Sequence, residues 1–182
     1  MYTPTNKPGS ENLLKLVNDV LELSRIESGN MSFHCEDCSA HHFAETVYQT
    51  HQVIILPPVE FIKEFPDEDV TIHIDRMRLT QVITNFLGNA KKFTSQGHIK
   101  LGYFCDKEKK EIHFFVEDTG AGIPKEELQM IFERFYKRNE FVQGVGLGLA
   151  ISKVIVEKMN GHIDVQSEVN KGSRFTAVLP YL

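Results

Sequence analysis

The segment from 75 to 94, DRMRLTQVITNFLGNAKKFT, constrains the fold of this chain more than any other stretch. Asp75 can cap a helix whose apolar residues recur at three- and four-residue intervals. β-like runs precede this helix at 58–65 and 69–74, and two more follow at 97–105 and 111–118, separated by the polar turn DKEKKE. Helical and strand periodicities therefore alternate, and they predict a mixed α and β domain. The predicted buried stripe of the helix consists of Leu79, Val82, Ile83, Phe86 and Ala90.

The flanking segments continue this alternation. The loop DTGAGIP is expected to open a helix, and Gly161 is placed to stop another. With 182 residues and ordinary hydrophobic content, the chain is long enough for one domain with its own core. The further predicted elements are a strand at Met31–Glu36, helices at Ser39–His51, 125–135 and Leu147–Asn160, and strands at 162–168 and 173–180.

The N-terminal region is predicted to be a flexible tail followed by one long helix. Residues 1–9 are rich in Pro, Gly, Thr and Asn, whereas Ser10 suits an N-cap and Gly29 suits a helix stop. Two apolar seams favour packing against further helices in a bundle or a dimer, and a helix docked only on its own domain remains the alternative. The seams consist of Leu13, Leu16, Val20 and Leu23, and of Leu14, Val17 and Leu21.

The charge balance argues against several classes of protein. The formal net charge is −5 and no basic stripe is present, so nucleic acid is not expected as a partner. No apolar run approaches the roughly 20 residues that span a bilayer, and the N-terminus lacks a signal pattern. We therefore expect a cytoplasmic location for this portion, whether or not a longer parent protein is membrane-anchored.

The cysteines favour a reducing compartment, because an odd number of three in a chain with ample core argues against a disulfide framework. Cys35 and Cys38 form a C-x-x-C pair close to several histidines, so a zinc site has to be weighed. Residues three apart on a predicted strand point to opposite faces, and we therefore expect no metal site here. The third cysteine is Cys105, and the nearby histidines are His34, His41 and His42.

Two segments carry polar residues that suit a nucleotide. Asn85, Asn89 and Lys92 form one stripe on the predicted helix, where amide oxygens suit Mg²⁺ and the lysine suits phosphate. Asp118 ends an apolar strand just before the glycines of DTGAGIP, and such a carboxylate can accept a hydrogen bond from the amine of adenine. Solvated helix residues and an ordinary Asp–Gly turn remain the alternatives.

A third segment, VQGVGLGL at 142–149, places Gly144, Gly146 and Gly148 before an apolar helix. Glycine-exposed amides at a helix N-terminus hold phosphate well, because unpaired N–H groups and the helix dipole both favour an anion. The two commoner phosphate loops do not fit, since no strand precedes the glycines and no G-K-[ST] is present.

In order and spacing, NFLGNAKKFT, DTGAGIP, IFERFY and GVGLGLAIS resemble the N box, first glycine box, F box and second glycine box of sensor histidine kinases. SENLLKLVNDVLELSRIESG resembles the second helix of their dimerisation and phosphoacceptor hairpin. The resemblance implies an α+β fold, a two-layer α/β sandwich of the Bergerat (GHKL) type preceded by one long helix. It divides the chain into a tail at 1–9, a hairpin helix at 10–29 and an ATP-binding catalytic domain at 30–182.

The resemblance also implies ATP and Mg²⁺ as ligands. Asn89 would coordinate Mg²⁺ with Asn85 assisting, and Lys92 would contact phosphate. Phe93 would flank adenine while Asp118 reads its amine. A mobile lid at 137–144 would cover the nucleotide and bring Lys137 and Arg138 to the γ-phosphate. The other residues that the resemblance assigns to ATP are Gly120, Gly122, Ile123, Phe132, Phe135, Tyr136, Gly144, Val145, Gly146, Leu147, Gly148, Leu149 and Ser173.

Two departures from the family pattern bear on the reaction. Superfamily members that hydrolyse ATP place a glutamate one turn before the Mg²⁺ asparagine, but Asn85 stands there, and its amide cannot take a proton from water. None of the eight histidines is followed by Asp or Glu, so none matches the family's acceptor histidine. His41 and His42 come nearest, and we interpret them as helix-surface residues.

These features imply transfer of the γ-phosphoryl group of ATP to a histidine outside this chain, in two-component signal transduction. The implied partners are a response regulator, the protein's own histidine-bearing hairpin helix and a second copy in a homodimer. A hydrolytic ATPase of the same superfamily and a non-catalytic interaction module are the alternatives.

Overall fold

A mixed five-stranded sheet forms one layer of the molecule. The computed structural model describes residues 7–137 and 146–181, with side chains from residue 13 onward. The strand order is β2-β4-β5-β7-β6; β2 and β4 are parallel, and every other neighbouring pair is antiparallel. The strands are β2 (Val59–Glu64), β4 (Gly97–Asp106), β5 (Glu111–Asp118), β6 (His162–Glu168) and β7 (Gly172–Pro180).

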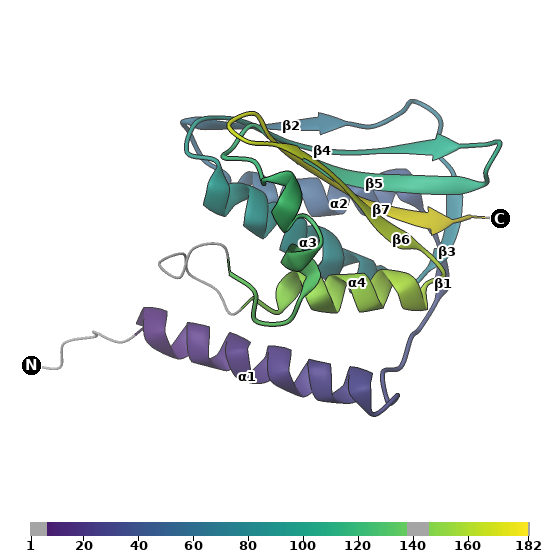
Figure 1. Cartoon of the computed structure of the whole chain (residues 1–182). Helices are drawn as coiled ribbons and strands as arrows, with labels where there is room; N and C mark the ends of the chain where they lie inside the picture. Colours follow the sequence, from purple (N-terminus) through teal and green to yellow (C-terminus); the bar gives the residue numbers. More distant parts are fainter. Residues whose placement is uncertain (1–6, 138–145, 182) are drawn as a thin grey trace, which may run out of the picture.

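Three helices, α2 (Ala40–Gln52), α3 (Arg76–Phe93) and α4 (Gly148–Lys158), cover one face of this sheet (Figure 1). A small antiparallel sheet of β1 (Glu36–Ser39) and β3 (Thr71–Ile74) stands beside them. The two layers confirm the predicted α+β sandwich and its preceding helix.

The core lies between the sheet and these helices, and β5 runs through its centre. Phe114 of β5 is fully buried, with ring centroids 5.3 Å from Phe43 of α2 and 5.6 Å from Tyr103 of β4. Phe86 of α3 packs against Phe175 of β7, with a centroid distance of 5.4 Å. The predicted stripe of α3 is buried at every position, and Asp75 caps the helix by accepting a hydrogen bond from the Arg78 N–H at 3.0 Å.

The long helix α1 (Lys7–Glu27) begins earlier than the sequence indicated. Ser10 lies inside it, so the cap prediction and the tail boundary at residue 9 were wrong. Pro8 is compatible with this start because the first helical turn has no backbone acceptor for its N–H groups. At the other end, Gly29 follows the helix with φ of +69°, as its predicted role as a stop requires.

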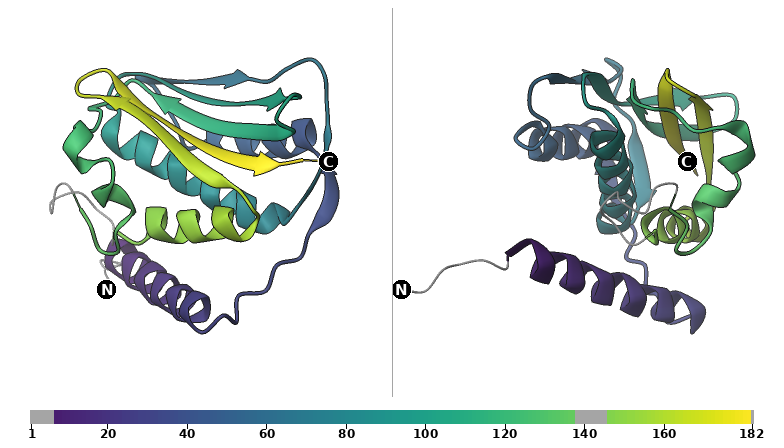
Figure 2. Two further views of the ribbon diagram at one scale, coloured as in Figure 1. Left: turned by 45° about the vertical axis from the view of Figure 1, so that its right-hand side comes forward. Right: turned by 60° about the vertical axis from the view of Figure 1, so that its left-hand side comes forward.

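The helix α1 docks below α3 and α4 through part of its surface (Figures 1 and 2). Leu23 is buried, and the Glu22 carboxylate pairs with Arg78 and also accepts a hydrogen bond from Gln81. Five other apolar side chains are 45–63% exposed, as the two-seam pattern would leave them without a helical partner, whereas Leu16 and Ile26 are half-buried. These exposed residues are Leu13, Leu14, Val17, Val20 and Leu21.

The strand predicted at Met31–Glu36 does not form, and β1 starts only at Glu36. Its partner β3 is four residues long and ends at Ile74, opposite Glu36, so earlier residues have no strand to pair with. The His34 N–H instead donates to the Asp75 carboxylate at 2.9 Å. Cys35 therefore precedes the strand, and the strand-alternation argument against a Cys35–Cys38 metal site loses its basis, although both thiols are free.

The helix predicted at 125–135 is replaced by two short 3₁₀ turns, η1 (Lys125–Glu127) and η2 (Met130–Phe132). The chain leaves helical geometry at Glu133, whose backbone is extended with ψ of 147°. Phe135 then adopts φ of +62° and donates its N–H to the Gly146 carbonyl at 2.9 Å, so the end of the segment bonds to the start of the next element. Of the two histidines interpreted as surface residues, His42 is exposed, but His41 is half-buried, 5.7 Å from the Phe65 ring.

None of the described helices is long and apolar enough to cross a membrane.

Replacing Phe114 with Ala removes a fully buried ring from the centre of the core. We expect the free energy of unfolding to fall by about 3–5 kcal/mol, as for other buried aromatic truncations. Phe104→Ala is the matched control, because Phe104 is 43% exposed, and it should cost about 1 kcal/mol or less. Urea unfolding followed by circular dichroism measures both; equal losses would contradict this placement of the core.

Candidate functional site

A cleft of about 590 Å³ opens on the helical side of the sandwich. It lies between α3, the loop after β5, the N-terminal end of α4 and one face of α1. Predicted site residues from all three sequence segments line it. They are Asn85, Asn89, Lys92, Phe93, Asp118, Gly122, Ile123, Tyr136, Lys137, Gly146, Leu147, Gly148, Leu149 and Ser173.

The α3 side of the cleft carries the two asparagines. The Asn85 Nδ2 donates to the Ser152 hydroxyl of α4 at 3.1 Å, which leaves Oδ1 as an available acceptor. Gly148 makes room for this side chain, because a Cβ there would lie 2.2 Å from the Asn85 Oδ1. Asn89, one turn further on, makes no side-chain hydrogen bond within the described part of the chain. Two amide oxygens on one helix face are therefore available to a hard cation.

Asp118 lies at the end of β5, opposite Ser173 of β7, and is only 7% exposed. Its Oδ1 accepts a hydrogen bond from the Gly120 N–H at 2.8 Å and a longer one from the Thr94 hydroxyl at 3.4 Å. Burial raises the pKa of the Asp118 carboxyl above its usual value, although these hydrogen bonds act in the opposite direction. The Asp118 carboxylate lines the cleft, where it can accept a hydrogen bond from a ligand donor.

The loop after Asp118 is held close to neighbouring backbone. A Cβ at Gly120 would lie 2.3 Å from the Phe93 carbonyl oxygen, so only glycine allows this loop to approach the end of α3 so closely. Gly122 adopts φ of +67°, where a side chain would also meet the Glu168 carbonyl at 2.0 Å. The loop backbone therefore packs tightly against neighbouring chain beside the buried carboxylate, and Gly122 lines the cleft.

The N-terminal end of α4 forms the opposite wall. Leu147 is fully buried and, as the N-cap residue, makes no side-chain capping bond, so among the described residues the first N–H groups of the helix remain available to an anion. Gly146 has φ of +77°, and its carbonyl accepts the bond from Phe135 that closes this end of the cleft.

Three lysines gather around the cleft. Lys92 and Lys137 come from the predicted set, and Lys15 comes from α1. Burial lowers the pKa of Lys92, and the charges of Lys15 and Lys137 lower it further. Beyond burial, the lowered pKa of Lys92 reflects repulsion among like charges. An anion bound between these lysines would relieve that repulsion.

Six predicted residues need separate comment. Gly120 adjoins the cleft through Asp118, whereas Phe132 and Phe135 do not line it. Phe132 packs against the core, and Phe135 is 60% exposed, so direct ligand contact from these rings has no support in the structure. Arg138, Gly144 and Val145, with most of the predicted lid at 137–144, lie outside the described residues.

Several residues that line the cleft were not predicted from the sequence. Arg78 and Gln81 precede Asn85 by seven and four positions, so extending the helical stripe backward would have found them. Lys15 and Asp19 could not be found this way, because only the docking of α1 brings them to the cleft. The other lining residues that were missed are Met77, Thr80, Thr84, Gly88, Ala90, Ile131 and Phe175.

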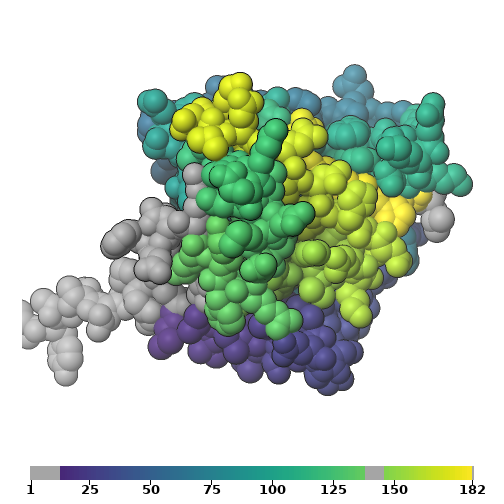
Figure 3. All heavy atoms as spheres, in the orientation of Figure 1, coloured from purple at the N-terminus to yellow at the C-terminus, as the bar shows by residue number. Residues whose placement is uncertain are grey.

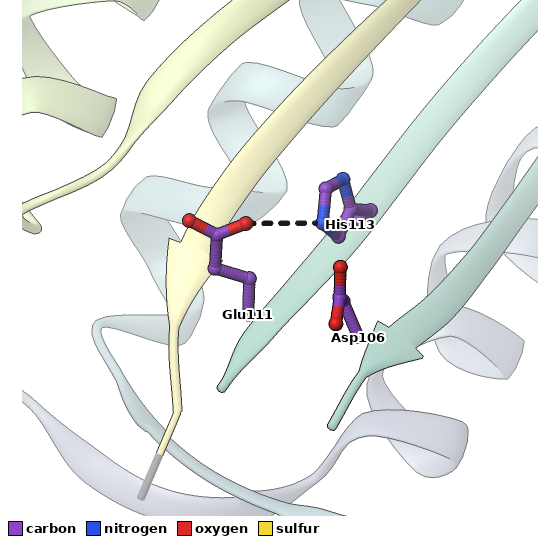
Figure 4. Close-up of side chains that lie close together, drawn as sticks. All are labelled: Asp106, Glu111 and His113. Carbon is purple, nitrogen blue, oxygen red and sulfur yellow. Dashed lines mark ion pairs between the residues drawn. The ribbon is translucent and has the colours of Figure 1, made fainter. Parts of the chain in front are cut away.

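A second cluster lies at the opposite end of β5. Among the described residues, Asp106, Glu111 and His113 are the one group of three whose ligand atoms converge, within 4.8 Å of one another (Figure 4). The Asp106 carboxylate already closes the β4–β5 turn, accepting hydrogen bonds from the Glu108 and Lys109 N–H groups at 3.1 Å. This cluster is too far along the strand to serve the cleft, so any cation there would not assist a nucleotide.

A sandwich whose cleft combines amide oxygens, a buried carboxylate and an open helix N-terminus has the architecture of a nucleotide-binding domain. A family profile described as "Histidine kinase-, DNA gyrase B-, and HSP90-like ATPase" matches residues 74–182, which contain every helix and strand of the cleft except α1. The chain belongs to this family.

Curated relatives are sensor histidine kinases. The chain is 34% identical over 177 residues to sensor histidine kinase WalK of Bacillus subtilis, covering 94% of this chain and 29% of WalK. It is 37% identical over 174 residues to sensor histidine kinase RcsC of Salmonella typhimurium, covering 92% of this chain and 18% of RcsC. The chain thus spans less than a third of these relatives.

Solved structures agree. Full-length ShkA in complex with AMPPNP is 29% identical, with a TM-score of 0.87 over 96% of this chain and 37% of ShkA. The catalytic domain of histidine kinase ThkA in a nucleotide-free form is 28% identical, with a TM-score of 0.72 over 83% of this chain and 97% of that domain.

The raised pKa of Asp118 has a consequence for stability. The folded state holds this proton more tightly than the unfolded chain, so the group's stabilising contribution is present at low pH and is lost as pH rises above about 3.8 through the raised value. At pH 7, ligand-free Asp118→Asn should therefore melt about 2–4 °C higher than the parent chain, and this advantage should vanish near pH 3.5.

Differential scanning calorimetry at the two pH values measures this effect. Asp67→Asn, at an exposed position outside the cleft, is the control and should change the melting temperature little at either pH. A lower melting temperature for Asp118→Asn at pH 7 would show that the carboxylate stabilises the fold.

Proposed function

We propose that this chain is the ATP-binding catalytic domain of a sensor histidine kinase, which presents the γ-phosphoryl group of Mg·ATP to a histidine outside the chain. One observation carries the proposal: Asn89 and Asp118, far apart in sequence, line a single cleft with the glycine-led start of α4. The names of the relatives and the similarity to ShkA, which was solved in complex with AMPPNP, support it.

Adenine recognition would rest on Asp118. A ring lying against the bare backbone of Gly120 and Gly122 would place its amine toward the carboxylate oxygen that the Gly120 N–H does not occupy. Ser173 lies opposite Asp118 on β7, and Phe93 lines the same cleft, so both would border the base.

The phosphate end would lie between α3 and α4. Lys92 and Lys137 supply positive charge, and the α4 N-terminus supplies unpaired N–H groups. The amide oxygens of Asn85 and Asn89 suit Mg²⁺, and both residues line the cleft. When bound, Mg²⁺ would neutralise phosphate charge; Arg138 would add to this from the proposed lid at 137–144.

Transfer to a histidine is favoured over hydrolysis. A general base must accept a proton from the attacking water, and Asn85, which takes the place of the family's hydrolytic glutamate, has no such capacity. The cleft instead offers positioning and charge neutralisation, the two effects on which phosphoryl transfer depends. A hydrolytic ATPase of the same family is the second candidate function.

The partners would follow from this role. We infer that α1 is the second helix of a dimerisation hairpin, because its exposed apolar residues provide a surface for the histidine-bearing helix and for a second copy. The hairpin helix would then be α1, whose start at Lys7 replaces the predicted start at residue 10, and the catalytic domain would span 30–182. A response regulator would receive the phosphoryl group in the cytoplasm.

The nucleotide proposal is tested by Asp118→Asn. The amide presents N–H donors where the carboxylate presents acceptors, so we expect the Kd for ADP to rise at least about tenfold, the loss expected for one charge-assisted hydrogen bond. Isothermal titration calorimetry measures this, with Asp67→Asn as the control expected to bind like the parent chain. Unchanged ADP affinity in Asp118→Asn would overturn the proposal.

The reaction is tested by adding a separate histidine-bearing hairpin from a sensor histidine kinase to the chain with Mg²⁺ and γ-labelled ATP. We expect label on the hairpin histidine, no label on this chain, and phosphate release close to the background rate. Phosphate release that is well above background without the hairpin, and that is lost in Asn85→Ala, would identify a hydrolytic ATPase instead.

A further inference from the structure

One face of α1 belongs to the cleft. Lys15 and Asp19 line the same space as Asn85, Asn89 and Lys92. Lys15, Asp19 and Leu23 are four residues apart along the helix, so they share the face that docks on the sandwich. On this face Leu23 is buried against the sandwich. Lys15 and Asp19, nearer the N-terminus of α1, line the cleft beside the predicted nucleotide residues.

Polar contacts fix this face against α3. Glu22 pairs with Arg78, and both side chains are shielded, at 16% and 17% exposed. Glu22 also accepts a hydrogen bond from Gln81, which lies one turn before Asn85. Further along α1, Glu27 pairs with Arg134, just after η2, and Figure 3 shows α1 directly beneath this green segment. The docking contacts therefore adjoin the cleft on two sides.

Lys15 completes a positively charged rim. It lies close enough to Lys92 to disfavour that lysine's charged form, as Lys137 also does. Within the described residues, none of these three lysines forms an ion pair with a carboxylate. Asp19 is the acidic group on the α1 side of the cleft; burial raises its pKa and the Lys15 charge lowers it, so this carboxylate offsets part of the Lys15 charge. Three lysines on one rim leave an excess of positive charge that a polyphosphate would balance.

We propose that Lys15 of α1 binds the polyphosphate tail of the nucleotide, so that triphosphate binding and docking of α1 stabilise each other. The proposal rests on the proposed nucleotide-binding function. It adds a phosphate-binding residue from outside the family-matched residues 74–182. Because coupling between binding events is reciprocal, a nucleotide that reaches Lys15 strengthens α1 docking to the same degree that docking strengthens its binding. AMP, which lacks the β- and γ-phosphates, gains little from this coupling.

Binding of ATP, ADP and AMP to variants at Lys15 tests this directly. In Lys15→Gln, the Kd for ATP should rise about tenfold while the Kd for AMP changes less than about twofold, because only the phosphate tail meets the lost charge. Lys15→Arg keeps the charge and should retain most of the ATP affinity. Lys158→Gln, an exposed lysine of α4 outside the cleft, carries the same charge change and should have no effect.

Hydrogen exchange gives the second readout. In the parent chain, ATP should increase protection of the amides of residues 13–27 more than AMP does, and Lys15→Gln should abolish this difference. A merely structural role would weaken ATP and AMP binding equally, which would overturn the proposal.

Asp118→Asn separates the two levels of inference. If Asp118→Asn loses nucleotide binding while Lys15→Gln binds ATP as the parent chain does, the role of Lys15 is wrong and the nucleotide site stands. If neither variant changes binding of any nucleotide, the proposed function itself fails.

Discussion

Burial of the apolar face of α3 against the sheet is the constraint on which the rest of the structure depends. Leu79, Val82 and Phe86 are fully buried, so the rotation of the helix about its axis is set. With that rotation set, Asn85 and Asn89 must stand at the edge of the core and face the cleft. The hydrophobic contact therefore positions the polar chemistry, and β5 ends at Asp118 on the same side.

Residues of the cleft lower the stability of the fold where ligand binding would need them. A carboxylate that is 7% exposed is costly to keep ionised, and its hydrogen bonds with Gly120 and Thr94 offset only part of that cost. Glycines recur wherever the walls come closest, since a Cβ at Gly120 or Gly148 would meet an oxygen within 2.3 Å. The glycines allow the close approach of the cleft walls, and the buried Asp118 carboxylate supplies the acceptor that adenine recognition would need.

Local pattern predicted elements well where strand or helix periodicity met a long partner. β5 and β6 have the ends expected from sequence, and Asp75 caps α3 as predicted. The predictions failed where a distant contact decided the backbone. The segment before Glu36 has no strand opposite it, and the segment of the two 3₁₀ turns ends in a hydrogen bond from Phe135 to the distant Gly146. Hydrophobic periodicity indicates which face of one helix or strand is buried. It carries no information about how long the partner strand is.

The sequence by itself determined the α+β class, the buried stripe of α3 and the residue types of the site, because these depend on spacing within single segments. Only the tertiary structure decided that Asn89, Asp118 and the start of α4 share one cleft, and that Lys15 of α1 reaches it. The reason is physical: helix periodicity fixes which residues share a face, whereas the contact between Glu22 and Arg78 fixes where that face lies. Such a contact joins residues 56 positions apart, beyond the reach of any local pattern.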